Sequence, residues 1–118
     1  MATLTKIPLS GSTHGRGIKI GATVVGSATT LHTAQATTTD GLGDEVVLYA
    51  RNSDSVSRTL SIAFGGTTAP DDVQTFTIAA GATVQVMAGL LIRNALVVGG
   101  FADATNVVVV WGYVLRST

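Results

Sequence analysis

The sequence predicts an all-β protein, an antiparallel sandwich or barrel of about eight strands with negligible helix. Glycine, threonine and valine are abundant, whereas the good helix formers Lys, Glu, Gln and Arg are scarce. Short apolar runs alternate with clusters of Gly, Asp, Asn and Ser at the spacing typical of sandwiches and barrels. No window places apolar residues at i, i+3, i+4 and i+7 against a polar opposite face, so no amphipathic helix is predicted.

The strands are predicted from the alternation of side chains across a pleated backbone. Val46, Leu48 and Ala50 are expected to share one face of their strand, as are Leu60 and Ile62 of the next. The turns between strands contain Asp-Gly, Pro-Asp and single glycines, which supply the backbone angles that tight turns need. The predicted strands cover residues 17–25, 29–34, 44–52, 57–65, 73–79, 82–88, 95–102 and 106–116.

Residues 1–16 are predicted to form a flexible N-terminal arm, and residues 17–118 a single domain. The arm contains Gly11 and Gly15 among polar neighbours and has few apolar anchors. A chain of 118 residues is the usual size of one domain.

Composition narrows the possible partners. The chain is 46% hydrophobic and 12% charged, and its 7 basic and 7 acidic residues give a net charge of +0. This balance predicts neither nucleic-acid nor membrane binding. The absence of cysteine excludes disulfides and thiolate metal sites. Because no secretory signal or bilayer-spanning run is recognisable, synthesis in a cytoplasm is expected.

No residue pattern predicts an enzyme, a cofactor or a metal. The two histidines, His14 and His32, lack the further ligands of a zinc site, so structural or solvent roles are expected. Nearly all carboxylates fall in predicted turns, where aspartate bonds to nearby backbone. Calcium binding by Asp71 with Asp72, or by Asp40 with Asp44, is a weaker alternative without EF-hand spacing.

Three other kinds of chemistry find little support in the sequence. A glycosidase pair is not excluded by sequence, but aromatic residues are only 5% of the chain. The segment GSTHGRGIKIG (11–21) matches neither phosphate-loop pattern and no helix is predicted after it. No G-x-S-x-G motif is present to activate a serine.

Two apolar stretches predict a subunit interface. Both faces of strand 106–116 are apolar, and residues 87–103 are nearly all apolar or small. A domain of this size buries too little surface to cover both faces of several strands, so partners are expected to cover the rest. Trp111 and Val109 are expected to face the core. The predicted contacts are Val108, Val110, Val114, Leu91, Ile92 and Val97.

Five segments resemble small virion proteins of tailed bacteriophages, of the head decoration or cement kind. The segments are LHTA (31–34), DEVVLYARNSD (44–54), LSIAFGGT (60–67), GLLIRNALVVGGFA (89–102) and NVVVVWGYVLR (106–116). The resemblance implies a jelly-roll-like sandwich, self-association (often as trimers), and attachment to the outside of an assembled capsid. It supplies no chemical residue to carry over, and related-looking proteins also occur in tails and fibres.

The expected function is therefore that of a structural virion protein, made in the host cytoplasm, that binds the major capsid protein and stabilises the capsid. The alternative is a carbohydrate- or receptor-binding module of a phage tail or fibre, because jelly rolls commonly serve as lectins. That alternative requires Trp or Tyr side chains on an accessible surface, whereas Trp111 and Tyr113 are expected to be packed.

Overall fold

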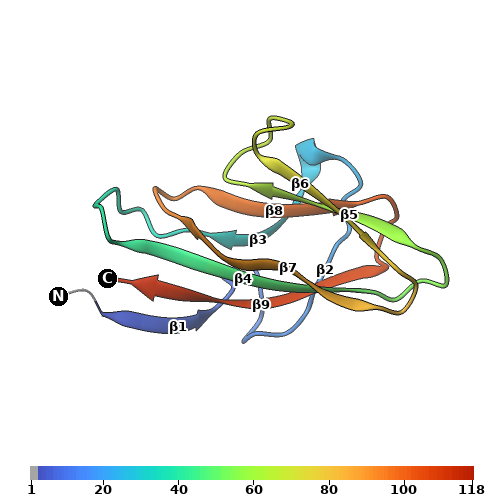
Figure 1. Cartoon of the computed structure of the whole chain (residues 1–118), viewed down its shortest axis with the longest axis horizontal. Coiled ribbons are helices and arrows are strands. Elements are labelled where there is room, and N and C mark those ends of the chain that lie inside the picture. Colours follow the sequence, from blue (N-terminus) through green and yellow to red (C-terminus); the bar gives the residue numbers. More distant parts are fainter. Residues whose placement is uncertain (1–2) are drawn as a thin grey trace.

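The computed structural model describes residues 3–118 and consists of two antiparallel β-sheets packed face to face (Figure 1). The molecule is elongated, 48 Å along its longest axis. Its elements are β1 (Leu4–Pro8), β2 (Ile18–Lys19), the 3-10 turn η1 (Val25–Ser27), β3 (Thr29–Thr33), β4 (Gly43–Asn52), β5 (Arg58–Phe64), β6 (Val73–Ile78), β7 (Thr83–Ile92), β8 (Val97–Ala102) and β9 (Val108–Ser117). The predicted all-β sandwich with negligible helix is confirmed.

The strand order is that of a jelly roll. One sheet has the order β1-β9-β4-β7, with β2 also pairing with β9, and the other has the order β3-β8-β5-β6. From β2 to β5 the chain alternates between the sheets, and it alternates again from β6 to β9 after the β5–β6 hairpin. This is the double Greek-key path of jelly rolls.

The core lies between the sheets and follows the predicted alternation in the middle of the chain. Val46, Leu48 and Ala50 of β4 face inward and are fully buried, as are Leu60 and Ile62 of β5. Their β-branched and leucine side chains interdigitate across the two inner faces, which is how aligned sandwiches form a core.

In β9 the predicted faces are reversed. Val108, Val110 and Val114 are fully buried in the core, whereas Trp111 is 37% exposed and Val109 is half-buried on the outside. The reason is the pairing with β4, in which Ala50 lies opposite Val110 and therefore shares its face. Because both faces of β9 are apolar, the sequence of the strand alone does not determine which one faces the core.

The predicted flexible arm is also wrong for the residues described. Leu4–Pro8 pairs with β9 from Ser117 back to Tyr113, and Leu9 is buried in the core. The backbone N–H of Gly11 donates to the carbonyl of Leu31 in β3 at 2.9 Å. The segment therefore closes one side of the sandwich. The sequence did not predict this because the partners of the segment, β9 and Leu31, lie far away in the sequence. Residues 1 and 2 of the predicted arm lie outside the described residues.

A tight turn at Asn94-Ala95 joins β7 and β8. Asn94 and Ala95 both have positive φ, 63° and 56°, and the N–H of Leu96 donates to the carbonyl of Arg93 at 3.4 Å. These are the backbone signs of a type I′ hairpin turn. β7 extends to Ile92, four residues further than residue 88, where it was predicted to end.

Candidate functional site

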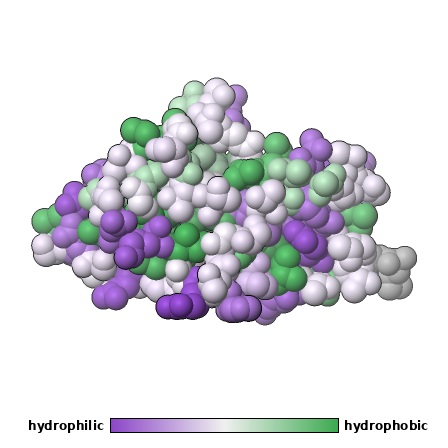
Figure 2. Space-filling model, turned by 180° about the vertical axis from the view of Figure 1, so that it is seen from behind, coloured by the Kyte–Doolittle hydropathy of each residue, from purple (hydrophilic) through white to green (hydrophobic). Residues whose placement is uncertain are grey.

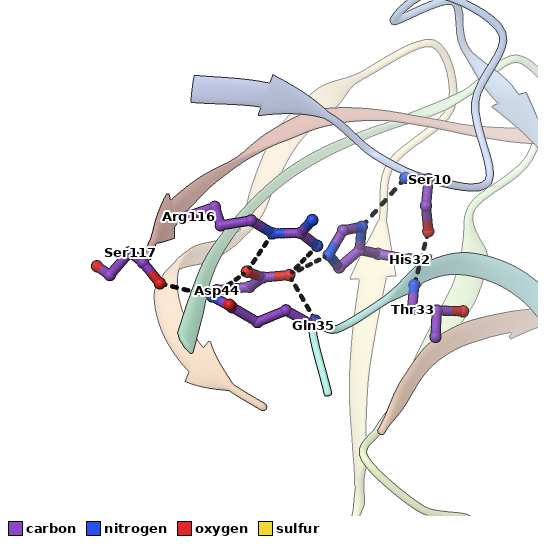
Figure 3. Close-up of polar contacts among 7 residues, drawn as sticks. All are labelled: Ser10, His32, Thr33, Gln35, Asp44, Arg116 and Ser117. Atoms are coloured by element: carbon purple, nitrogen blue, oxygen red, sulfur yellow. Dashed lines mark hydrogen bonds and ion pairs between the residues drawn. The ribbon is translucent and has the colours of Figure 1, made fainter. Parts of the chain in front are cut away.

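A buried carboxylate, Asp44, joins both sheets at one end of the sandwich (Figure 3). Its oxygens accept two hydrogen bonds from the Arg116 guanidinium, at 2.9 and 2.8 Å, and one from Nε2 of His32 at 2.7 Å. They also accept the backbone N–H of Gln35 at 3.2 Å and its side-chain Nε2 at 3.1 Å. His32 belongs to one sheet and Asp44 and Arg116 to the other, so the group fastens the two layers together.

The hydrogen bonds around His32 assign its tautomer. Nδ1 accepts the backbone N–H of Ser10 at 3.1 Å, so this nitrogen carries no proton. Nε2 then carries the proton that is donated to Asp44. The imidazole is neutral, and the charge that balances Asp44 belongs to Arg116.

Electrostatics keep Asp44 ionised. Burial by itself would raise the pKa of its carboxyl, but hydrogen bonds from Arg116, His32 and Gln35 outweigh this and lower the pKa from 3.8 to about 2. The bond to Asp44 raises the pKa of Arg116 in turn. A carboxylate that accepts several donors in this way is held in one position and one charge state.

The Asp44–His32 pair has a structural role, although an Asp–His pair also occurs in catalytic triads. Both side chains have no exposed surface, and both ring nitrogens are already bonded, one of them to the backbone of Ser10. No imidazole nitrogen is left to take a proton from a substrate. The structural role expected of His32 agrees with this arrangement.

Sequence reasoning missed the Asp44 cluster. The predicted strand 44–52 begins at Asp44, but its carboxylate was considered only as a turn residue or as a calcium ligand with Asp40; it is the second residue of β4 and is buried. A charged residue among the apolar residues of a long strand was the available signal, because buried charges occur where they are paired. Its partner Arg116 lies 72 residues away in the sequence, which no local pattern reveals.

The outward surface of β9 and β4 forms a second candidate, which we call the Trp111 face. The register of β9 with β4 places Trp111 directly opposite Tyr49, and Tyr113 opposite Val47. Each such set of paired residues forms one row across the face. Trp111 and Tyr49 are 37% and 39% exposed, whereas Val47 is buried by its neighbours. The face comprises Val109, Trp111, Tyr113 and Leu115 of β9 with Val47 and Tyr49 of β4. Part of the second apolar surface of β9 is thus covered within the chain itself, and two aromatic rings are left accessible.

Basic side chains border the Trp111 face. Within residues 3–118, three arginines form salt bridges, Arg58 with Asp54, Arg93 with Asp40 and Arg116 with Asp44. The four remaining cations are exposed and form no salt bridge in this part of the chain, and each lies on or beside the Trp111 face: Lys6, Arg16, Lys19 and Arg51. The amino group of Lys6 lies 4.8 Å from the centroid of the Tyr113 ring, a cation–π contact.

The third candidate is an apolar surface around the β7–β8 turn, which we call the turn patch. It consists of the exposed side chains Leu90, Leu91, Leu96 and Val97. Two hollows of about 540 and 380 Å³ adjoin it, and both are lined by Gly65 and Leu96. Elsewhere, hydrophobic residues on the side shown in Figure 2 form separate small groups with hydrophilic residues between them.

The predicted interface residues are divided by the structure. Leu91 and Val97 are 58% and 41% exposed and belong to the turn patch. Ile92 is buried in the core like Val108, Val110 and Val114, so these four are not available to a partner in the folded subunit. The outward residues of β9 are the ones that had been expected in the core.

Three of the remaining carboxylates lie in turns or loops and accept backbone N–H groups, as predicted, whereas Glu45 is an exposed residue of β4. Asp54 accepts the N–H of Ser55, Asp72 that of Thr68, and Asp103 that of Thr59. In residues 3–118 no three His, Asp or Glu side chains are grouped so that they could hold a metal ion. The part of the chain described contains no helix long and apolar enough to cross a membrane.

Comparison with known proteins gives no relative for this chain: no protein-family model, no curated protein and no solved structure matches it.

Proposed function

We propose that this protein is a structural virion protein that binds the outside of a phage capsid and stabilises it. The observation that carries the proposal is the turn patch, an exposed apolar surface at one end of a jelly roll. A group of exposed apolar side chains around one turn of a small domain is a candidate interaction site. The resemblance of five segments to decoration proteins supports the major capsid protein as the proposed partner.

Hydrogen bonds to residues 35–40 hold the β7–β8 turn that carries the turn patch. Arg93 donates to the carbonyl of Thr39 and to Asp40, and the N–H of Asn94 donates to the carbonyl of Thr37. The N–H of Ala95 donates to the carbonyl of Gln35, which is itself bonded to Asp44. A surface held in its binding conformation loses little conformational freedom on association, which favours affinity.

Self-association completes the proposal. We propose a homo-oligomer, most simply a trimer, because several copies of one weak patch bind a repeating shell far more tightly than a single copy. The turn patch, with Leu91 and Val97, contributes to contacts with the capsid or between subunits.

Co-sedimentation with empty heads of the phage that encodes the chain tests the function, and light scattering tests the oligomer. Leu91→Asp should abolish binding to heads because it places a charge in the centre of the contact. Val56→Asp is the matched control, since Val56 is 51% exposed against 58% for Leu91 but lies in the β4–β5 loop. Binding that survives Leu91→Asp, or is lost equally in both variants, would contradict the role of the patch.

A second candidate function is the binding of glycans or a receptor. One observation favours it: Trp111 and Tyr49 lie side by side and accessible on the Trp111 face, where the sequence had predicted packed aromatics. Exposed aromatic rings on a sheet are platforms for ligands with apolar faces. Loss of cell or glycan binding in Trp111→Ala, with head binding retained, would assign the protein to this class.

A further inference from the structure

Two cations flank Val109 on the Trp111 face, one on each of the strands that pair with β9 there. Lys19 of β2 lies opposite Val109 of β9, and Arg51 of β4 lies opposite Val109 on its other side. Paired residues share a face, so all three side chains point outward. With neighbouring strands about 4.8 Å apart, the two cations start about 10 Å apart, and their long side chains can reach one group above Val109.

A third exposed cation, Arg16, lies three residues before Lys19 in the sequence. Arg16 is exposed and precedes Gly17, which lies against the outer face so closely that a Cβ there would come within 2.8 Å of the Trp111 ring and 2.7 Å of Val109. None of Arg16, Lys19 and Arg51 forms a salt bridge within residues 3–118. The positive charge at this point is therefore available to a ligand.

The aromatic pair lies in the next row of the same face. Trp111 and Tyr49 follow Val109 and Arg51 at two-residue spacing, which is about 7 Å along the strands. An anionic group above Val109 would thus have two accessible rings beside it. The combination suits a ligand that carries a negative charge on a ring with an apolar face.

We propose that this row binds an acidic glycan, with a carboxylate or sulfate held between Lys19 and Arg51 and the adjoining sugar ring packed on Trp111 and Tyr49. The inference rests on the second candidate function, glycan binding, and names its ligand class. It is independent of capsid attachment, because the turn patch does not include these residues.

The distribution of charge favours a glycan over a nucleic-acid strand. Single-stranded nucleic acid carries a phosphate at every nucleotide and is bound along grooves that are basic throughout. Here the cations gather at the Val109 end, whereas at the other end of the face Glu45 and Lys6 flank Leu115 and largely cancel. One local anionic group fits this pattern better than a continuous chain of phosphates.

Binding of the full-length protein to immobilised oligosaccharides tests the proposal. The probes are hyaluronan, polysialic acid and heparan sulfate fragments, each beside a neutral glucan of equal length, and oligothymidylate. We expect at least one acidic glycan to bind and its neutral counterpart not to bind. Lys19→Glu and Trp111→Ala should each weaken binding about tenfold or more, as substitutions of central contacts do.

Lys6→Glu is the matched control, since it makes the same change of charge about 20 Å along the same face. It should retain most of the binding. The inference is overturned if no acidic glycan binds, if oligothymidylate binds more tightly, or if Lys6→Glu weakens binding as much as Lys19→Glu. Head binding lost in Lys19→Glu without any glycan binding would also overturn it, while leaving the proposed capsid function intact.

Discussion

Replacing Asp44 by asparagine tests whether the buried cluster holds the end of the sandwich together. The amide keeps the size of the carboxylate but presents an NH₂ group to donors on Arg116, His32 and Gln35. The substitution also leaves the Arg116 charge without its partner. Breaking a buried ion pair by removing one member costs about 3–5 kcal/mol, which is a large part of the stability of a small domain.

Urea unfolding measures this loss as a shift of the midpoint at unchanged slope. Asp40→Asn is the matched control, because Asp40 also pairs with an arginine, Arg93, but its side chain is 99% exposed. We expect the control to change the free energy of unfolding by less than about 1 kcal/mol. A loss below about 1 kcal/mol in Asp44→Asn would refute the reasoning, because the cluster would then contribute no more than a surface pair.

The same carboxylate predicts how stability depends on pH. Its pKa is lowered from 3.8 to about 2 in the folded protein, so its contribution is present above pH 4 and is lost as the pH falls through 2. This lowering of the Asp44 pKa corresponds to about 2 kcal/mol of folding free energy. The pKa of Asp54 is also lowered, by its bond to Arg58, so Asp54 also contributes to the pH dependence of stability. The difference between the pH profiles of the wild type and Asp44→Asn over this range isolates the contribution of Asp44. Parallel pH profiles would contradict the prediction.

Three further variants test the fold. Val110→Asp places an unpaired charge in the core and should unfold the subunit at a cost of several kcal/mol, whereas Trp111→Asp leaves its charge in water and should remain folded by circular dichroism. Removing residues 1–12 deletes β1 and the buried Leu9, so urea unfolding should show a loss of at least about 3 kcal/mol. Ala95→Gly relieves a left-handed alanine (φ 56°) in the β7–β8 turn and should raise the free energy of unfolding by about 0.5–1 kcal/mol. A stable truncated chain, or a less stable Ala95→Gly, would contradict the last two.

Local patterns predicted most of the strands because strands and turns are encoded over a few residues. The alternation of Val46, Leu48 and Ala50 against Val47 and Tyr49 is visible in the sequence and is the observed one. The β7–β8 turn lies close to the gap between the predicted strands 82–88 and 95–102, although β7 runs four residues further than predicted.

What the sequence did not reveal depends on contacts between distant segments. The N-terminal strand forms only by pairing with β9, and the core-facing side of β9 is decided by β4. The Asp44 cluster joins residues from three strands and one loop, so no spacing within any of them encodes it. The exposed aromatic pair was missed for the same reason, because its exposure follows from the orientation of β9.

A net charge of zero does not exclude a local charged surface. It predicts that no uniform field surrounds the protein, but charges of opposite sign can still lie on different surfaces. The cations that form no salt bridge within residues 3–118 surround the Trp111 face, whereas Asp71 and Asp72 lie in the β5–β6 loop and Asp103 in the β8–β9 turn. The Val109 end of the Trp111 face is therefore basic although the chain as a whole is neutral, and this end adjoins the exposed aromatic rings.

The two proposed surfaces can act at the same time. The turn patch lies at the end of the sandwich where β7 meets β8, and Lys19 and Arg51 lie at the Val109 end of the Trp111 face. Leu91 shares a row with Glu45 and Leu115, six residues along β9 from Val109, so about 20 Å separate the two. A subunit that attaches to a shell through its turn patch would keep the basic aromatic row accessible. Attachment and glycan binding are therefore expected to respond to different substitutions, Leu91→Asp affecting the first and Lys19→Glu the second.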